Sequence, residues 1–172
     1  MGEVRRYESF PVTMVAASVL VTISIYALGA LILGVLGPVV AAAYLLYCAF
    51  FELRVMGHSC VNCCYYGKVC ALGRGKISAY IFPQGDPEIF ARMNITWAML
   101  IPDVLVMLLP LLGGVILLVR SFSWMVAVGM VLLTALALGG NAFVRTRIAC
   151  KYCKQREIGC PAEKFFGGAQ TH

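Results

Sequence analysis

Apolar residues run along this chain in long blocks, separated by short polar stretches. Residues 11 to 51 include no Asp, Glu, Lys or Arg, and the sequence "GVLGP" at 34–38 provides a turn within this block. Two further apolar blocks lie on either side of the polar "RSFS" at 120–123. A helix needs about 20 apolar residues to cross a hydrocarbon layer about 30 Å thick. The pattern therefore predicts four membrane spans, at about 11–33, 38–56, 95–119 and 122–144.

These spans predict an all-α integral membrane protein, a four-helix transmembrane bundle that forms a single domain of residues 1–172. The composition agrees, because 61% of the residues are hydrophobic and 13% are charged, and the mean hydropathy is +0.86. Such values lie outside the range of soluble globular domains. In the linker between the second and third spans, Asp86 followed by Pro87 is a helix-start signal, and we expect residues 87–94 to lie along the lipid headgroups.

The basic residues predict the orientation in the membrane. Of the 14 Lys and Arg residues, 13 precede the first span, lie at the end of the second or between the second and third, or follow the fourth, and Arg120 is the exception. Cytoplasmic loops carry the excess of Lys and Arg, so we expect a multi-pass protein of the cell membrane with both termini in the cytoplasm. Attraction of these residues to anionic lipid explains the net charge of +6. Membrane lipid is therefore an expected partner, and nucleic acid is not.

Seven of the eight cysteines fall in two segments expected in the cytoplasm, 57–76 and 148–161. Their spacings are identical: Cys60-x2-Cys63-x6-Cys70 in the first and Cys150-x2-Cys153-x6-Cys160 in the second. Each segment follows an even-numbered span, which suggests two tandem helical hairpins, each followed by the same cysteine pattern. A repeat of this kind would bring both segments to one face of the membrane. Cys48 lies inside the second span and is interpreted as a packing residue.

A Cys-x2-Cys pair puts two thiols on one tight turn, and two such pairs supply the four thiolates of a zinc site. Iron–sulfur clusters also take four thiolates, and the "CP" at 160–161 is typical of ferredoxin sequences. Redox-active thiols without a metal are a third interpretation, and His58 is a further candidate ligand. The candidate ligands for an iron–sulfur cluster or zinc are Cys60, Cys63, Cys64, Cys70, Cys150, Cys153 and Cys160.

Three polar residues are expected at similar depth in the membrane. Asp103 is the acidic residue within a span, and intramembrane carboxylates usually mark functional sites. Glu52 ends the second span and Asn141 lies near the end of the fourth. Together they would form a cofactor-binding pocket beneath the cysteines, suited to a proton, a cation or a quinone-like headgroup. Alternatively, Asp103 pairs with Arg54 or Arg92.

The segments "HSCVNCCYYGKVC" and "CKYCKQREIGCP" resemble those of small four-helix membrane proteins of archaea and anaerobic bacteria. Those proteins carry one cysteine segment after helix two and another, ending in "CP", after helix four. Besides the cysteines, the specific matches are Tyr65, Tyr66, Gly67 and Pro161, and this chain has Cys64 where that group has a proline. The resemblance implies the architecture and a shared cysteine site, and it supplies no reaction.

The sequence leaves three functions open. The first is a membrane-embedded subunit whose cytoplasmic, cysteine-ligated metal centre transfers electrons to or from a membrane or cytoplasmic partner protein. The second is a non-redox membrane scaffold with structural zinc. The third is a small transporter that uses Asp103 and Glu52. No catalytic motif is present, so any enzymatic role would be that of a subunit in an oxidoreductase complex.

Overall fold

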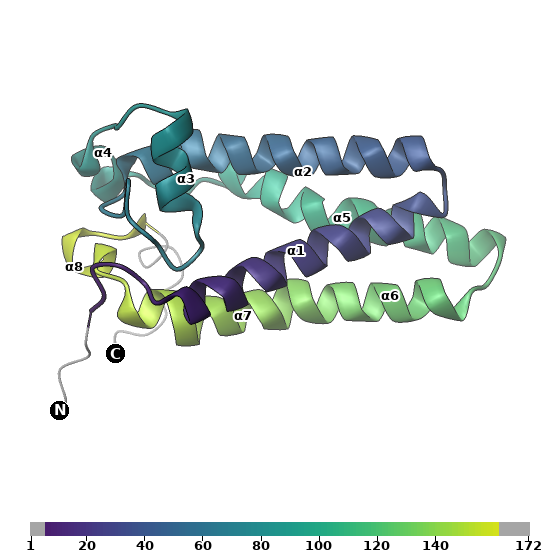
Figure 1. The fold of residues 1–172 in the computed structure, drawn as a ribbon. Helices are drawn as coiled ribbons and strands as arrows, with labels where there is room; N and C mark the ends of the chain where they lie inside the picture. The colour runs from purple at the N-terminus through teal and green to yellow at the C-terminus, as the bar shows by residue number, and fades with distance from the viewer. Residues whose placement is uncertain (1–5, 162–172) are drawn as a thin grey trace. The chain divides into compact units, whose positions relative to one another are not determined.

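The apolar blocks fold as long helices in a computed structural model, which describes residues 6–161 (Figure 1). Among these residues, four helices are long and apolar enough to cross a membrane, which confirms the predicted all-α, four-helix, multi-pass architecture. The elements are α1 (Val12–Gly34), α2 (Pro38–His58), η1 (Cys60–Asn62), α3 (Arg74–Ile81), α4 (Pro87–Arg92), α5 (Trp97–Arg120), α6 (Trp124–Thr134), η2 (Ala135–Gly140), α7 (Asn141–Phe143), η3 (Val144–Ala149), η4 (Cys150–Tyr152) and α8 (Gln155–Ile158).

Two helices run further than the apolar pattern predicts. The second span continues from α2 into η1, and the fourth continues as helix through η2, α7, η3 and η4 to Tyr152. The sequence places the end of the fourth span at about residue 144 because Arg145 and Arg147 follow. Charged residues end an apolar span without ending a helix, since Arg is a good helix former. As a consequence, Cys60 and Cys150 lie at helix ends.

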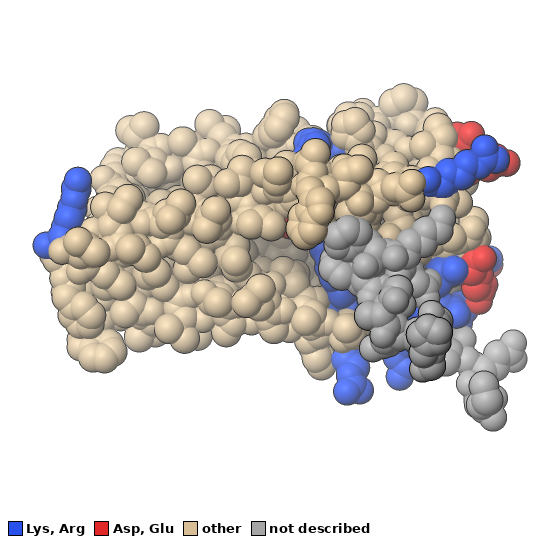
Figure 2. Space-filling view, turned by 180° about the vertical axis from the view of Figure 1, so that it is seen from behind, with Lys and Arg blue, Asp and Glu red and all other residues tan. Residues whose placement is uncertain are grey.

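The contacts divide the chain into two compact units. The described residues of unit 1 fall within Met1–Val19, Leu53–Trp97 and Val144–His172, and those of unit 2 are Leu20–Glu52 and Ala98–Phe143. Unit 2 has three charged residues in its sequence, Glu52, Asp103 and Arg120. The broad surface without charged side chains in Figure 2 reflects this composition. All of the described cysteines except Cys48 belong to unit 1.

Small residues bring the helices of unit 2 close together. A Cβ at Gly29 of α1 would collide with the ring of Tyr44 from α2. A Cβ at Gly113 of α5 would collide with Leu33 of α1. In lipid, helices associate through close packing instead of the hydrophobic effect, and small residues allow the backbones to approach closely enough for this packing.

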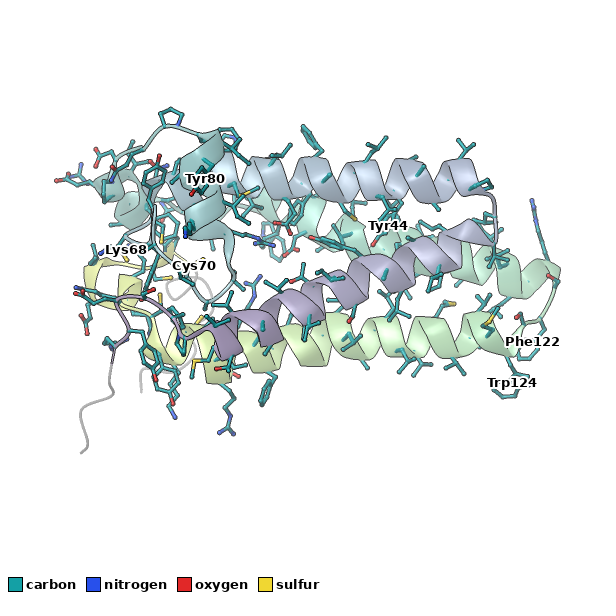
Figure 3. The ribbon with its side chains drawn as sticks, in the orientation of Figure 1. Tyr44, Lys68, Cys70, Tyr80, Phe122 and Trp124 are labelled. Atoms are coloured by element: carbon teal, nitrogen blue, oxygen red, sulfur yellow. The ribbon has the colours of Figure 1, made fainter. Side chains whose placement is uncertain are left out.

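A tyrosine repairs the backbone defect that a proline makes in α5. Pro110 has no N–H, so the carbonyl of Val106, four residues earlier, loses its helical donor. The Tyr44 hydroxyl, labelled in Figure 3, donates to this carbonyl oxygen at 2.9 Å. Tyr47, one turn along α2, donates to the Pro102 carbonyl at 2.8 Å, although this carbonyl keeps the N–H of Val106 as its helical donor. Backbone groups that proline leaves unpaired in a membrane span must be satisfied by neighbouring side chains.

In unit 1, Asn62 fixes the linker that follows α3. Its amide nitrogen donates to the His58 carbonyl at 3.0 Å, and its amide oxygen accepts from the backbone N–H of Asp86 at 2.9 Å. Asp86 caps α4, as the sequence predicts, by accepting the N–H of Glu88 at 2.8 Å. Because residues 93–96 then leave helical geometry, α4 is a short separate helix and does not continue into α5.

Candidate functional site

The two Cys-x2-Cys pairs fold as the same turn. In each, the three residues from the first cysteine form a single 3₁₀ turn, η1 or η4. The Cys63 N–H donates to the Cys60 carbonyl at 3.3 Å, and the Cys153 N–H donates to the Cys150 carbonyl at 3.4 Å. The backbone is then extended at both Cys63 (φ −86°, ψ 149°) and Cys153 (φ −80°, ψ 123°). The repeat that the spacing suggests is therefore present in the local backbone.

Gln155 joins the two turns. Its side chain is 2% exposed, and its amide oxygen accepts the Cys64 backbone N–H at 2.9 Å and lies 3.6 Å from the Cys63 sulfur. Its amide nitrogen donates to the Gly159 carbonyl at 3.0 Å. All of the polar atoms of this buried side chain are used, which is the condition for burying an amide without a large cost. Gln155, which follows the second turn, therefore holds the first turn in place.

Tyr65 makes a second connection between the segments. Its ring is 3% exposed, and its hydroxyl donates to the Tyr7 carbonyl at 2.5 Å and accepts the backbone N–H of Lys154 at 3.0 Å. The ring packs on Phe10, with 5.5 Å between centroids, and both belong to a small core with Ala71. The cysteine segments thus have a core of their own, which the sequence pattern does not reveal.

The segment before α1 completes this connection. Tyr7 forms a parallel bridge with Cys153, its N–H donating to the Tyr152 carbonyl at 3.2 Å, and the Phe10 N–H donates to the Val69 carbonyl at 2.9 Å. The Arg6 guanidinium donates to the Cys153 carbonyl at 3.0 Å. Residues 6–10 therefore contact both cysteine segments. The sequence assigns this segment only a basic flanking role.

Cys153 has four cysteines within electrostatic reach. Burial, with the nearby Cys63, Cys160 and Cys150 sulfurs as smaller causes, raises the pKa of the Cys153 thiol to about 11. The Cys153 charge in turn acts on Cys64. Both segments contribute to this group of Cys63, Cys64, Cys150, Cys153 and Cys160, which we call the sulfur group.

The neighbours Cys63 and Cys64 ionise differently. A side-chain hydrogen bond with Cys64, followed by burial, raises the pKa of Cys63. The same bond lowers the pKa of Cys64, and the cationic Lys68 and Lys154 lower it further. Cys64 thus ionises before its neighbour Cys63, and both Cys63 and Cys153 keep their protons near neutral pH. An acidic thiol beside basic side chains is typical of a reactive or metal-binding cysteine.

The remaining predicted ligands lie in different surroundings. The Cys70 sulfur, labelled in Figure 3, accepts the Gly75 N–H at 3.3 Å from the first turn of α3 and packs against the aromatic core. Cys60 begins η1, and His58 is the exposed last residue of α2. Cys48 is buried in unit 2, in agreement with its interpretation as a packing residue.

The residues of the sulfur group are suitable ligands for a thiophilic metal, but they are not arranged as a metal site in this structure. Within residues 6–161, no three His, Cys, Asp or Glu side chains have the arrangement of a metal site. The donors themselves are suitable, because thiolates on Cys-x2-Cys turns are the ligands of zinc and iron–sulfur sites. Ligation would require Cys63 and Cys153 to lose their protons and the sulfurs to move together, as metal binding commonly does in small thiolate sites.

Two of the three polar residues predicted to form a pocket have hydrogen bonds to residues outside this set. Glu52 accepts a hydrogen bond from the Tyr26 hydroxyl at 2.6 Å, and the Asn141 amide donates to the Ala137 carbonyl of its own helix at 3.1 Å. Asp103 lies in the second turn of α5 with an exposed side chain. These contacts provide no support for the predicted pocket.

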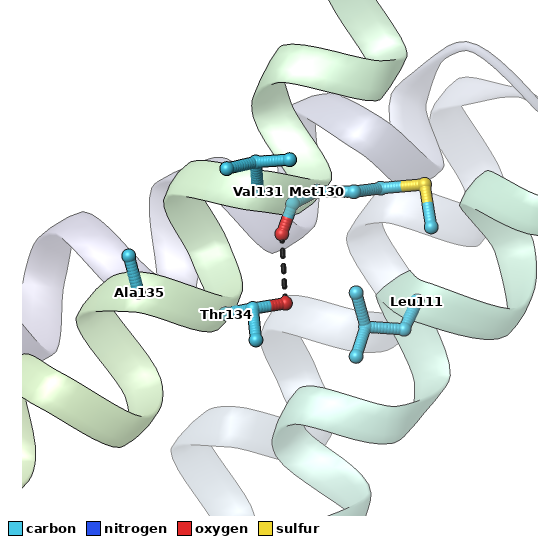
Figure 4. Close-up of a pocket in the computed structure, with 5 residues that line it drawn as sticks. All are labelled: Leu111, Met130, Val131, Thr134 and Ala135. Atoms are coloured by element: carbon cyan, nitrogen blue, oxygen red, sulfur yellow. Dashed lines mark hydrogen bonds between the residues drawn. The ribbon is translucent and has the colours of Figure 1, made fainter.

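The surface hollows of unit 2 are apolar. One of about 490 Å³ contains a single polar side chain, Thr134, whose hydroxyl donates to the Met130 carbonyl at 2.8 Å (Figure 4). A second hollow, also of about 490 Å³, is lined by Ile23, Tyr26, Ala27, Ala30, Leu31 and Leu45. Neither has the converging polar groups of a typical ligand site.

No protein-family model, no curated protein and no solved structure matches this chain. Three residues that hold the sulfur group together, Gln155, Tyr65 and Tyr7, were not among the predicted site residues. Gln is mostly a surface residue, so its burial has no sequence signal. Tyr65 differs, because its position next to the Cys63–Cys64 pair was an available signal.

Proposed function

We propose that this chain is a membrane subunit in which the sulfur group binds an iron–sulfur cluster and transfers electrons to or from a partner protein on the cytoplasmic side. The observation that carries the proposal is that two Cys-x2-Cys turns of the same geometry, 90 residues apart, are joined through Gln155. When bound, such a cluster takes up and releases one electron at a time. The chain supplies the thiolate ligands, a partly buried environment and nearby basic side chains.

The aromatic core favours a redox role over a purely structural one. Phe10, Tyr65 and Ala71, together with the hydrogen bonds of Gln155, connect the two segments without a metal. Structural zinc is most needed where a small segment has no core. The surplus of thiols over the four that one zinc ion takes points in the same direction.

Structural zinc is the second candidate, and one observation favours it. The four cysteines of the two Cys-x2-Cys turns, Cys60, Cys63, Cys150 and Cys153, match in number and type the donors that one tetrahedral zinc ion takes. In that case the metal would stabilise the segments and undergo no change of oxidation state.

Metal analysis of the full chain tests both candidates. After purification without oxygen, iron, acid-labile sulfide and zinc are measured, and the visible spectrum is recorded before and after addition of dithionite. We expect stoichiometric iron and sulfide and a visible band that weakens on reduction. A colourless protein with stoichiometric zinc would reject electron transfer and support the second candidate, and a metal-free protein would reject both.

Cysteine variants then locate the centre. Cys153→Ser removes the thiol that interacts electrostatically with four other cysteines. We expect metal affinity to fall by more than about tenfold, since even outer partners of a metal ligand contribute 10- to 100-fold. Cys48→Ser is the matched control, because it makes the same substitution at a cysteine that is buried in unit 2, outside the sulfur group. Equal metal loss in both variants would show that the sulfur group is not the site.

A further inference from the structure

Helix α3 presents its large apolar side chains to the outside. Ile77, Tyr80 and Ile81, spaced as one helix face, are 51%, 83% and 50% exposed. The small residues Gly75 and Ser78 instead face the protein, and Ser78 is 0% exposed. This is the reverse of a helix on a water-soluble domain, where the large apolar residues are buried. Tyr80 is labelled on α3 in Figure 3.

Backbone contacts fix α3 in this rotation. A Cβ at Gly75 would collide with the carbonyl oxygens of Tyr65 and Lys68, so no larger side chain fits there. The Gly67 N–H also donates to the Gly75 carbonyl at 3.0 Å. Turning the helix to bury Ile77 and Tyr80 would move bulkier residues into this contact. The apolar face is therefore held outward and needs a partner other than its own unit.

Both ends of α3 contact the ends of membrane spans. A Cβ at Gly73, the residue before α3, would lie 3.3 Å from side-chain atoms of Val15 and Val19, in the first two turns of α1. After α3, the ring of Phe82 lies 3.4 Å from the corresponding position at Gly57, in the last turn of α2. These turns are where the chain enters and leaves the bilayer, so α3 lies at the level of the membrane–water interface.

The charged residues of the segment that contains α3 are all basic. Residues 53–85 include no Asp or Glu, whereas Lys68, Arg74 and Lys76 lie on or beside the helix. Lys68 and Lys76 are exposed. One acidic residue of another segment, Glu8, interacts electrostatically with Lys68. Its hydrogen bond, however, is with Lys154. Basic residues at the membrane surface attract anionic headgroups.

We propose that α3 is an interfacial helix that inserts Ile77, Tyr80 and Ile81 at the boundary between headgroups and acyl chains, and that Lys68, Arg74 and Lys76 bind anionic lipid there. An exposed apolar face beside basic residues is the composition of helices that lie in this zone. The sequence predicts such a role for residues 87–94, whereas α3 has the more extensive apolar face and the higher positive charge. This proposal does not depend on the identity of the metal.

A fluorescent reporter tests the insertion. The full chain with Trp97→Phe, Trp124→Phe and Tyr80→Trp is reconstituted into phosphatidylcholine nanodiscs that contain brominated lipid, which quenches nearby tryptophan. The matched control carries Gln84→Trp instead, since Gln84 is exposed in the linker four residues later. We expect quenching of the residue 80 reporter and little quenching of the control. A residue 80 reporter quenched only by aqueous acrylamide, or shielded from both quenchers by a second protein chain, would overturn the proposal.

Exchange of the brominated lipid tests the charge selectivity. With the Tyr80→Trp reporter, we expect brominated phosphatidylglycerol to be preferred over brominated phosphatidylcholine by at least about twofold. The changes Lys68→Gln, Arg74→Gln and Lys76→Gln together should abolish the preference, whereas Lys151→Gln, an exposed cation of the second segment, should leave it unchanged. If the triple variant fails to fold, 1 M salt on the unmodified reporter must weaken the preference, because it screens these charges. Equal quenching by both lipids would contradict the selectivity.

Discussion

Individual residues hold the sulfur group together more than its cysteines do. Gln155 pairs with the Cys64 N–H and the Gly159 carbonyl, and Tyr65 pairs with Tyr7 and Lys154. Every one of these contacts joins segments far apart in the chain, except the contact within the second segment to Gly159. These contacts hold the two cysteine segments against each other.

Replacing Gln155 by Leu should loosen the site. The variant leaves the part-buried Cys64 N–H and Gly159 carbonyl without their partners, and an unpaired group costs up to about 1–3 kcal/mol when it is fully buried. We expect a lower melting temperature and faster maleimide labelling of Cys63 and Cys64, measured by mass spectrometry. Gln84→Leu, at an exposed position, is the control. Unchanged labelling rates would show that Gln155 does not hold the first turn.

Metal binding should strengthen as the pH rises. The pKa of Cys153 is raised to about 11 and that of Cys63 is also raised, so both thiols are protonated near neutral pH and each proton competes with the metal. Affinity should increase by up to about tenfold per pH unit for each proton released. Competition with a chromophoric chelator between about pH 6 and pH 9 measures this slope. A flat profile would mean that these two thiols are not ligands.

At the scale of elements, the helices of unit 2 depend on partners that compensate for prolines. Pro110 disrupts the hydrogen bonding of α5, and Tyr44 from α2 pairs with the carbonyl that is left. Pro102 and Pro110 in the sequence predict one or two kinks in this helix. The sequence does not predict which side chain pairs with the carbonyl that Pro110 leaves without a helical donor, because that side chain belongs to another helix.

A double-mutant cycle measures this compensation. Tyr44→Phe should destabilise the protein by about 1–3 kcal/mol, because the buried Val106 carbonyl loses its donor. In a Pro110→Ala background the cost should be much smaller, since the N–H of residue 110 can then donate to Val106. Unfolding in mixed micelles with increasing dodecyl sulfate gives both free energies. Equal costs in the two backgrounds would contradict the explanation.

At the scale of the whole molecule, the positive-inside pattern predicts that the sulfur group faces the cytoplasm. The native cysteines of unit 1 should then escape a membrane-impermeant maleimide applied to intact cells. Ser121→Cys, at an exposed position between α5 and α6 beside Arg120, should be labelled under the same conditions. Permeabilised cells provide the control for reactivity of the native thiols. Labelling of the unmodified protein in intact cells would reverse the proposed orientation.

The sequence by itself determined the four helices, their approximate bounds and the cysteine spacing. Hydrophobicity and helix-start signals such as Asp86 act within short windows of the chain, so they can be interpreted without knowledge of distant contacts. Only the tertiary structure decided that Gln155 joins the two turns, that residues 6–10 contact both segments, and that α3 turns its apolar face outward. Each of these depends on packing between residues remote in sequence, and such packing has no local pattern from which it could be predicted.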